Sequence, residues 1–259
     1  MPKSNNLMRI GQALTLAALC GTASPVSAAV LYATSFENPP FTVGPIAGQD
    51  GWAEFPGSGA AFVENSFALT GTQAVDVIPA LATGQNGPYK TVNTLAPIVE
   101  QSAEIYLASS STQSAWQFAA VGAGLIGFAG GIDIDANNTI HAITGSFPII
   151  GTFTRNTWNE VDLILDYATQ TYTIDLNGVA IASDIAFCGS NAGCTGAVVP
   201  SYVNGLFDTF AGVASVNDIG YIDNYSVSTP SAVPEPASLA LFGSGLVALG
   251  AIRRRRKVV

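Results

Sequence analysis

Short runs in which apolar and polar residues alternate constrain the fold of this 259-residue chain more than any other feature. In the run 158–166, the apolar residues Val161, Leu163 and Leu165 occupy every second position. Successive side chains of a β-strand point to opposite faces, so this period of two predicts a strand with one buried face. Between residues 30 and 229 no stretch shows the longer period of an amphipathic helix.

Similar runs, rich in Val, Ile, Thr, Phe and Tyr, are separated by Gly, Pro, Asn and Ser. They predict strands at 30–36, 60–64, 73–77, 102–107, 116–121, 125–134, 139–144, 158–166, 171–177, 179–183, 207–214 and 221–228. Asn177-Gly178 is a strong hairpin signal, and the Asp-Ala-Asn-Asn sequence at 135–138 marks a second turn. Many short strands joined by hairpins predict an all-β domain, either a two-sheet sandwich or a barrel.

The charges of the chain are distributed very unevenly. Of the nine Lys and Arg residues, two lie before residue 30 and five after residue 252, so only Lys90 and Arg155 lie between. All of the 18 acidic residues except Glu235 lie in that central part. Such an acidic surface repels nucleic acid, whose phosphates need Lys and Arg to neutralise them. It is compatible with solubility outside the cell, with cation binding, and with neutral or cationic polysaccharide.

The first 29 residues have the layout of a secretory signal peptide. Lys3 and Arg9 precede an apolar run at 10–19, which is followed by small residues. The sequences at 26–28 and 27–29 both fit the small-x-small cleavage rule, which predicts a mature chain that starts at Ala29 or Val30. We therefore expect export through the Sec translocon, and a single β-sandwich domain at 30–229.

Residues 230–259 form a tail of three parts. Its first part, which proline keeps extended, consists of Val233, Pro234, Glu235 and Pro236. The apolar, uncharged segment 237–252 predicts a short transmembrane helix. The basic cluster that follows consists of Arg253, Arg254, Arg255, Arg256 and Lys257. By the positive-inside rule this cluster stays in the cytoplasm, so the domain at 30–229 lies outside.

The order of Val-Pro-Glu-Pro, short apolar helix and arginine cluster closely resembles the PEP-CTERM sorting signal. The resemblance covers residues 233–259. In that family a membrane exosortase processes the tail at the Pro-Glu-Pro region, and the carriers are typically Gram-negative bacteria that make exopolysaccharide. The resemblance implies a protein that is anchored in the inner membrane before processing and then lies at the cell surface or outside the cell. Exosortase and exopolysaccharide are its expected partners.

Two of the three cysteines, Cys188 and Cys194, lie in one Gly-rich segment of the exported part. Close cysteines in an exported chain predict a local disulfide. A metal site is the weaker alternative, because the single histidine, His141, is distant in sequence and two thiolates rarely hold zinc.

The order of motifs between residues 30 and 229 looks like the concanavalin A-like jelly roll, which includes laminin-G-type modules. The stretches that carry this resemblance are 35–37 (Ser-Phe-Glu), 48–52 (Gly-Gln-Asp-Gly-Trp), 131–135 (Gly-Ile-Asp-Ile-Asp), 158–166, 172–178 and 220–224 (Gly-Tyr-Ile-Asp-Asn). The alternative is the galactose-binding-like carbohydrate module, which also starts with a Phe-Glu strand and ends with an Ile-Asp strand. Either resemblance implies a jelly-roll β-sandwich.

One group of carboxylates is similar to a catalytic motif. Jelly-roll glycoside hydrolases of the laminarinase and lichenase type place Glu-x-Asp-x-x-Glu on one strand, with the outer carboxylates as nucleophile and acid/base. In Glu160, Asp162 and Asp166 the third residue comes one position too late and is too short, so Asp166 is interpreted as the start of a turn. His141, the single histidine, alternates within a strand and is interpreted as a sheet-face residue. We expect a non-catalytic protein, with a divergent glycoside hydrolase as the alternative.

Many β-sandwich sugar-binding modules hold a structural calcium ion between their first and last strands. The ligands there are the Glu of the Phe-Glu pair and the Asp of the Ile-Asp pair, so the resemblance implies Glu37 and Asp223 here. Carboxylate oxygens are ligands that calcium prefers. The spacing of Asp133, Asp135 and Asn137 is also similar to a calcium loop, but it lacks the glycine and the closing glutamate, so a hairpin is predicted.

Exposed aromatic rings present flat surfaces to sugar rings, and Trp52, in a Gly-rich segment, is the candidate ligand-binding residue. Trp158 lies at the start of a strand and is expected in the core. Together these features predict an exported, non-catalytic surface or matrix protein that binds glycan. A structural spacer with no ligand is the second alternative.

Overall fold

The computed structural model describes residues 28–54, 61–78, 87–109, 115–121, 128–187, 203–204, 206–210 and 219–230. The chain divides into two units, Ala29–Pro230 and a second unit made of Met1–Ala28 and Ser231–Val259. The first unit is all-β, as predicted: apart from a short turn of 3-10 helix, η1 (Gln49–Gly51), each regular element in the described ranges is a strand.

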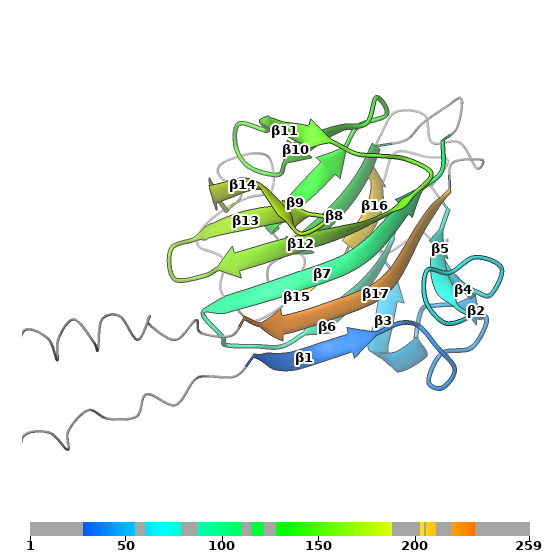
Figure 1. The fold of residues 1–259 in the computed structure, drawn as a ribbon. Coiled ribbons are helices and arrows are strands. Elements are labelled where there is room, and N and C mark those ends of the chain that lie inside the picture. Colours follow the sequence, from blue (N-terminus) through cyan, green and yellow to red (C-terminus); the bar gives the residue numbers. More distant parts are fainter. Residues whose placement is uncertain are drawn as a thin grey trace, which may run out of the picture. The chain divides into compact units, whose positions relative to one another are not determined.

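The larger of its sheets, here called the large sheet, has nine strands. In chain order they are β1 (Ala29–Thr34), β2 (Gly44–Pro45), β4 (Ala61–Glu64), β5 (Ala74–Val77), β7 (Ile98–Leu107), β12 (Trp158–Asp166), β13 (Thr171–Leu176), β14 (Val179–Ala186) and β17 (Gly220–Thr229). In space the order is β14-β13-β12-β7-β17-β5-β4-β2, and β1 also pairs antiparallel with β17. The first and last strands of the unit therefore lie side by side (Figure 1).

A second layer of strands lies behind the large sheet in the view of Figure 1. The small sheet of this layer contains, in spatial order, β11 (Ile149–Thr152), β10 (Thr139–Ala142), β9 (Phe128–Ile134), β8 (Ala115–Val121) and β16 (Leu206–Phe210). A third sheet consists of β15 (Val203–Asn204), β6 (Pro88–Val92) and β3 (Trp52–Glu54). The domain is thus a sandwich of two layers.

The hydrophobic core lies between these layers. Alternation along β12 turns Val161, Leu163 and Leu165 inward, and all three are fully buried. Tyr172 of β13 spans the two layers, because its hydroxyl donates to the backbone oxygens of Gly131 (3.2 Å) and Ile143 (3.0 Å) in the opposite layer. On β7, β12 and β13, the side chains that turn away from the core are exposed or half-buried.

Both predicted hairpin turns are present in the structure. Asn177 and Gly178 have φ values of 54° and 71°, and they join β13 to β14. Asn138 has a φ of 72° in the turn between β9 and β10. The two residues of the Asn-Gly pair tolerate this left-handed backbone, which explains why the sequence signal was reliable.

Several strands were not predicted. β2, β3 and β15 have two or three residues each, too few to show a period of two. β6 starts with a proline, which indicates a break in most sequence contexts but is tolerated at the first position of a strand. β11 is an edge strand without buried residues, and β7 begins at Ile98, four residues before the prediction.

Some predictions concern residues outside the described ranges. They are the signal peptide before residue 28, the disulfide between Cys188 and Cys194, the membrane helix at 237–252 and the basic cluster at 253–257. In the part of the chain that the structure describes, no helix is long and apolar enough to cross a membrane.

Candidate functional site

A row of aromatic side chains crosses the solvent side of the large sheet. Tyr221 of β17 pairs in register with Tyr106 of β7, which pairs in register with Trp158 of β12. The ring centroids of Tyr106 lie 6.1 Å from Tyr221 and 5.6 Å from Trp158. All three side chains are half-buried, although each points away from the core. The expectation that Trp158 belongs to the core is therefore wrong, because its position in the alternation places it opposite the buried Val161 face.

A fourth ring, Phe67, lies against this row. It comes from the loop at 65–73 that joins β4 to β5. Its centroid is 4.7 Å from Tyr106, 4.9 Å from Tyr221 and 5.6 Å from Trp158, and it is nearly parallel to the indole. The four rings, hereafter the aromatic cluster, form one continuous apolar surface that is partly open to solvent.

Three carboxylates fasten the 65–73 loop through its backbone. Glu64 accepts hydrogen bonds from the amides of Ser66 (2.8 Å) and Phe67 (2.9 Å). Asp223 Oδ2 accepts from the amides of Leu69 and Thr70, both at 3.0 Å. Because these bonds fix the loop backbone, they also fix the ring of Phe67 over the sheet.

The third carboxylate, Glu37, lies just after β1. Its Oε1 accepts from the amides of Thr72 (2.7 Å) and Gln73 (2.9 Å), and its Oε2 accepts from the Thr72 hydroxyl (2.8 Å). These hydrogen bonds, first among them the one from the Thr72 amide, hold the pKa of Glu37 below its usual value.

The pairing of the first and last strands brings Glu37 and Asp223 close together, as the calcium prediction required. Burial, together with the negative charge of Glu37, raises the pKa of Asp223. The oxygens Glu37 Oε1 and Asp223 Oδ2 each already accept two backbone N–H groups, which leaves few lone pairs for an ion that needs six to eight oxygens. No group of three or more His, Cys, Asp or Glu side chains in the described ranges is arranged to hold a metal. As placed here, the two carboxylates fit a loop clamp better than a calcium site.

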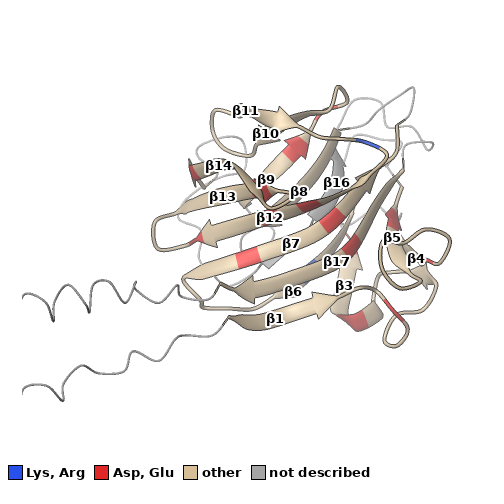
Figure 2. Ribbon diagram, viewed as in Figure 1, with Lys and Arg blue, Asp and Glu red and all other residues tan. Residues whose placement is uncertain are grey.

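Carboxylates continue the solvent side of the sheet next to the aromatic cluster. Glu160 of β12 lies opposite Glu104 of β7, and Asp162 lies between Ser102 of β7 and Asp175 of β13. Figure 2 shows acidic positions on the adjoining strands β7 and β12. Strands β7, β12, β13 and β17 contain no Lys or Arg, so nothing on them neutralises the charges.

The crowded carboxylates hold protons unusually tightly. Burial, then the charges of Glu160, Glu100 and Asp175, raise the pKa of Asp162 to about 6, against the hydrogen bond from Ser102. Burial and the neighbouring charges of Glu160, Asp162 and Asp223 likewise raise the pKa of Glu104. This face therefore favours any ligand that supplies hydrogen-bond donors or positive charge.

The three residues of the hydrolase motif have different surroundings. All three lie on the solvent side of β12, but Asp166, at its end, accepts hydrogen bonds from the amides of Ala168 (2.8 Å) and Thr169 (3.1 Å) in the following turn. Although partial burial opposes them, these bonds keep the pKa of Asp166 low. A carboxylate that caps a turn and stays ionised is a poor acid for protonating a leaving group. Sequence reasoning missed Glu104, which the register places opposite Glu160, because that neighbour comes from another strand.

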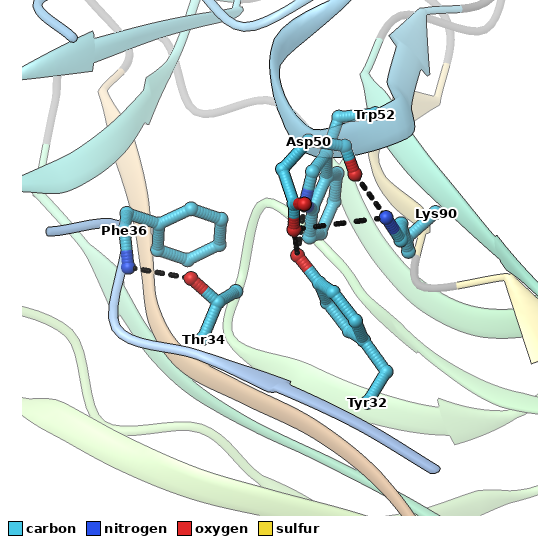
Figure 3. Close-up of polar contacts among 6 residues, drawn as sticks. All are labelled: Tyr32, Thr34, Phe36, Asp50, Trp52 and Lys90. Atoms are coloured by element: carbon cyan, nitrogen blue, oxygen red, sulfur yellow. Dashed lines mark hydrogen bonds and ion pairs between the residues drawn. The ribbon is translucent and has the colours of Figure 1, made fainter. Parts of the chain in front are cut away.

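The structure contradicts the exposure of Trp52 on which its prediction as a ligand-binding residue depended. Its side chain is 1% exposed and packs edge-on against Tyr225, at a centroid distance of 5.1 Å. The indole N–H donates to the hydroxyl of Tyr32 (2.9 Å), which donates in turn to Asp50 (2.7 Å). Lys90 completes the group: its ammonium lies 4.2 Å from the centre of the Tyr32 ring and bonds to the backbone oxygen of Asp50 (Figure 3). The glycine-rich sequence around Trp52 suggested an exposed loop, but these contacts hold the segment so that the indole ring is buried.

His141 lies on β10, as expected for a sheet-face residue. One ring nitrogen lies 3.0 Å from Asp135 Oδ2 and the other 3.1 Å from the backbone oxygen of Phe147. Asp133 and Asp135 lie on either side of Ile134, the last residue of β9, just before the predicted hairpin turn. Asp133 accepts a hydrogen bond from the Gln117 side chain and is not part of a calcium-loop arrangement. The structure therefore confirms the hairpin interpretation of this stretch.

Comparison of sequences identifies the tail. Residues 232–256 match the PEP-CTERM protein-sorting motif, so this is an exported protein that an exosortase processes, and the resemblance stated from the sequence is confirmed. No curated protein is similar in sequence to the chain as a whole.

Comparison of structures concerns the domain. β-Agarase A from Zobellia galactanivorans has a TM-score of 0.52 at 13% identity, over 81% of this chain and 94% of the agarase. A carbohydrate esterase of the Shiga toxin-encoding bacteriophage phi24B has a TM-score of 0.53 at 12% identity, over 79% of this chain and all of the esterase. A sialidase gives the same TM-score and identity over 79% of this chain, which spans only 18% of the sialidase. At such identities the likeness shows the fold alone, and that fold is the predicted jelly-roll β-sandwich.

Proposed function

We propose that the sandwich is a non-catalytic glycan-binding module of an exported surface or matrix protein. The binding face is the solvent side of β17, β7 and β12. The observation that carries the proposal is the row of Tyr221, Tyr106 and Trp158 in register beside unneutralised carboxylates. The fold is shared with an agarase and a carbohydrate esterase, proteins named for action on carbohydrate, which agrees with this proposal.

The two halves of this face match the two surfaces of a sugar ring. The aromatic cluster offers half-exposed apolar rings, against which the C–H face of a pyranose packs and sheds water. Glu104, Glu160 and Asp162 offer carboxylate oxygens, which accept hydrogen bonds from sugar hydroxyl or amino groups. Sites of this kind combine apolar walls with a few directed polar groups.

The charge of the face determines the class of glycan. Uronate or sulfate groups would be repelled by carboxylates that already repel one another. A neutral glycan avoids this repulsion, and a glycan with free amino groups, which are positively charged when protonated, is attracted to the carboxylates. We therefore propose neutral or amine-bearing polysaccharide as the ligand class, in the exopolysaccharide layer that the sorting signal leads us to expect.

The test is binding of the full chain to three immobilised polysaccharides that differ in charge. We expect retention on neutral xylan or cationic chitosan and none on anionic alginate, with binding to chitosan weakening as salt is added. Retention on alginate alone, or on none of the three, would contradict the proposal.

One observation favours a second function. Glu104 and Glu160 are directly opposed on neighbouring strands and lie on the same side of the sheet, and retaining glycoside hydrolases use a pair of neighbouring carboxyl groups. If the chain is a glycoside hydrolase, its catalytic pair is therefore Glu104 and Glu160, and Asp166 is not part of it. If the chain degrades a polysaccharide that it binds, Glu160→Gln must abolish the activity, and undiminished turnover would remove the alternative.

A further inference from the structure

The acceptor pattern for N-linked glycosylation, Asn-x-Ser/Thr with no proline in the middle, occurs twice in this sequence. The two stretches are 137–139 (Asn-Asn-Thr) and 224–226 (Asn-Tyr-Ser). The chain is an exported protein, the class in which this pattern acts as an acceptor. An attached glycan is bulky and hydrophilic, so it requires a position at the surface. The surroundings of each stretch therefore decide whether it can carry one.

The first stretch lies at the turn of the β9–β10 hairpin. The amide of Asp135 donates to the backbone oxygen of Thr139 (2.9 Å), and the amide of Asn138 donates to that of Asp135 (2.8 Å), which closes the turn. Thr139 is the first residue of β10, and Ala136 and Asn137 at the tip are exposed. A group attached to the Asn137 side chain would therefore meet solvent.

The side chain of Asn137 is held at one end. Its Oδ1 accepts a hydrogen bond from the backbone N–H of Thr139 (3.0 Å), which makes an Asx turn. Because a backbone N–H can only donate, this contact identifies the oxygen end of the amide. Within the described ranges, no residue accepts a hydrogen bond from Asn137 Nδ2. The nitrogen that a glycan would be attached to is thus the unpaired end of the side chain.

This hydrogen bond also favours the chemistry of glycan attachment. An amide nitrogen is a weak nucleophile, because its lone pair is delocalised into the carbonyl group. It becomes reactive as it loses a proton, and negative charge then gathers on the oxygen. The N–H of Thr139 donates to that oxygen in Asn137, and a donor placed where charge develops stabilises the reacting form. The product keeps the oxygen, so the same bond holds the glycosylated side chain.

The second stretch, 224–226, has the opposite surroundings. It lies within β17, where it pairs with β7 on one side and with β1 on the other. Its middle residue, Tyr225, is fully buried. Asn224 is half-buried, and its Oδ1 accepts a hydrogen bond from the hydroxyl of Thr70 in the 65–73 loop (2.8 Å). A sugar on Asn224 would compete with this loop for space, so the folded domain accommodates a glycan on the hairpin and not on the strand.

Charge also separates the two stretches. Asp135 comes two residues before Asn137, and its side chain is 40% exposed, although its Oδ2 lies 3.0 Å from a ring nitrogen of His141. The residue at the same place before Asn224 is the buried Ile222. An enzyme that binds an anionic, phosphate-linked sugar donor carries cationic groups, and these attract an acidic acceptor as well. Asp135 therefore gives the hairpin a recognition feature that the strand lacks.

We propose that Asn137 is the attachment site of an N-linked glycan, which is transferred after export from an oligosaccharide linked to a lipid diphosphate. In this step Asn137 Nδ2 loses a proton and forms a bond to the anomeric carbon of the first sugar. The bond from that carbon to the phosphate oxygen breaks, and the lipid diphosphate leaves with the electron pair. The modification does not depend on the function proposed for the aromatic cluster, because β9 and β10 belong to the small sheet.

Trypsin alone places the two stretches in different peptides. Lys90 and Arg155 are the only basic residues between 30 and 252, so Asn137 falls in the peptide 91–155 and Asn224 in the peptide that begins at residue 156. The test is mass spectrometry of these peptides from the full chain, purified from the bacterium that exports it. We expect the peptide 91–155 to be heavier by a whole number of sugar residues, and Asn224 to be unmodified.

Matched variants locate the added mass. Asn137→Asp keeps the oxygen that accepts from Thr139 but removes the nucleophile, so it should lose the added mass completely. Thr139→Val, which lacks the hydroxyl of the pattern, should lose it too, whereas Thr139→Ser should keep it. Asn93→Gln is the control and should keep the mass, because Asn93 is an exposed asparagine of the same peptide that lies outside the pattern.

Two results would overturn the proposal. One is a wild-type peptide 91–155 with the mass of its sequence alone. The other is an added mass that survives Asn137→Asp, since the sugar would then be attached elsewhere in the peptide. Neither result bears on the aromatic face, whose binding is measured separately with Tyr106→Ala.

Discussion

Replacing Gly71 with alanine is expected to destabilise the domain by about 3 kcal/mol. Gly71 has a φ of +63°, a left-handed conformation that costs an L-residue about 1 kcal/mol. A Cβ atom at this position would also overlap the Glu37 carboxylate. Displacing that carboxylate breaks its bonds to the amides of Thr72 and Gln73, each worth about 1 kcal/mol at this partly exposed site.

The same reasoning predicts strong coupling between Gly71 and Glu37. Glu37→Ala loses three hydrogen bonds, and so about 3 kcal/mol, two of them from backbone amides. In the double variant the alanine at 71 no longer meets a carboxylate, so only its conformational cost of about 1 kcal/mol is added. The double variant should lose about 4 kcal/mol rather than about 6, a coupling of about 2 kcal/mol.

Urea unfolding followed by tryptophan fluorescence measures these free energies. Gly178→Ala is the matched control, because Gly178 has a φ of +71° but no atom near its missing Cβ, so it should lose only about 1 kcal/mol. The pKa of Glu37 is lowered in the folded state, so its contribution is complete above its unfolded value of 4.5 and is lost as the pH falls. Equal losses for the two glycines, or additive losses in the double variant, would refute the loop clamp.

Three further predictions concern charge, calcium and cysteine. Folding raises the pKa of Asp162 from 3.8 to about 6, so the ionised carboxylate destabilises the folded state, and this penalty grows as the pH rises through that range. Asp162→Asn should therefore raise the urea midpoint at pH 7 and leave it unchanged below pH 4. A lower midpoint at pH 7 would contradict this prediction. If calcium binds as the family resemblance implies, millimolar calcium should raise the thermal midpoint of wild type but not of Glu37→Ala; an equal response of both would exclude that site. A disulfide between Cys188 and Cys194 should make the purified exported chain unreactive to maleimide until it is reduced, and prompt labelling would disprove it.

Local sequence signals predicted those parts of the fold that depend on few residues. The alternation of Val161, Leu163 and Leu165 correctly identified both the strand and its buried face. Asn177-Gly178 correctly identified its hairpin, since that turn depends on two residues that tolerate positive φ. The Pro-Glu-Pro tail was equally readable, because its three parts follow one another along the chain.

The candidate site could be predicted only in part, because it is assembled across strands. Glu104 and Glu160 are far apart in sequence and meet through the register of β7 and β12, which no local pattern reports. The aromatic cluster combines three strands and a loop for the same reason. Trp52 was expected to be exposed and Trp158 to be buried, and both expectations were wrong. Which face of a sheet a residue occupies depends on which strands pair and in what register, and the local sequence does not give this.

The central claim is that a glycan binds on the aromatic side of the large sheet. Its most direct measurement is calorimetric titration of the full chain with chitosan hexaose and with xylohexaose, in wild type and in Tyr106→Ala. The matched control is Leu95→Ala, an apolar side chain that is 86% exposed elsewhere in the domain. We predict that Tyr106→Ala weakens binding at least tenfold and that Leu95→Ala leaves it intact. Affinity that is the same in both variants would contradict the account.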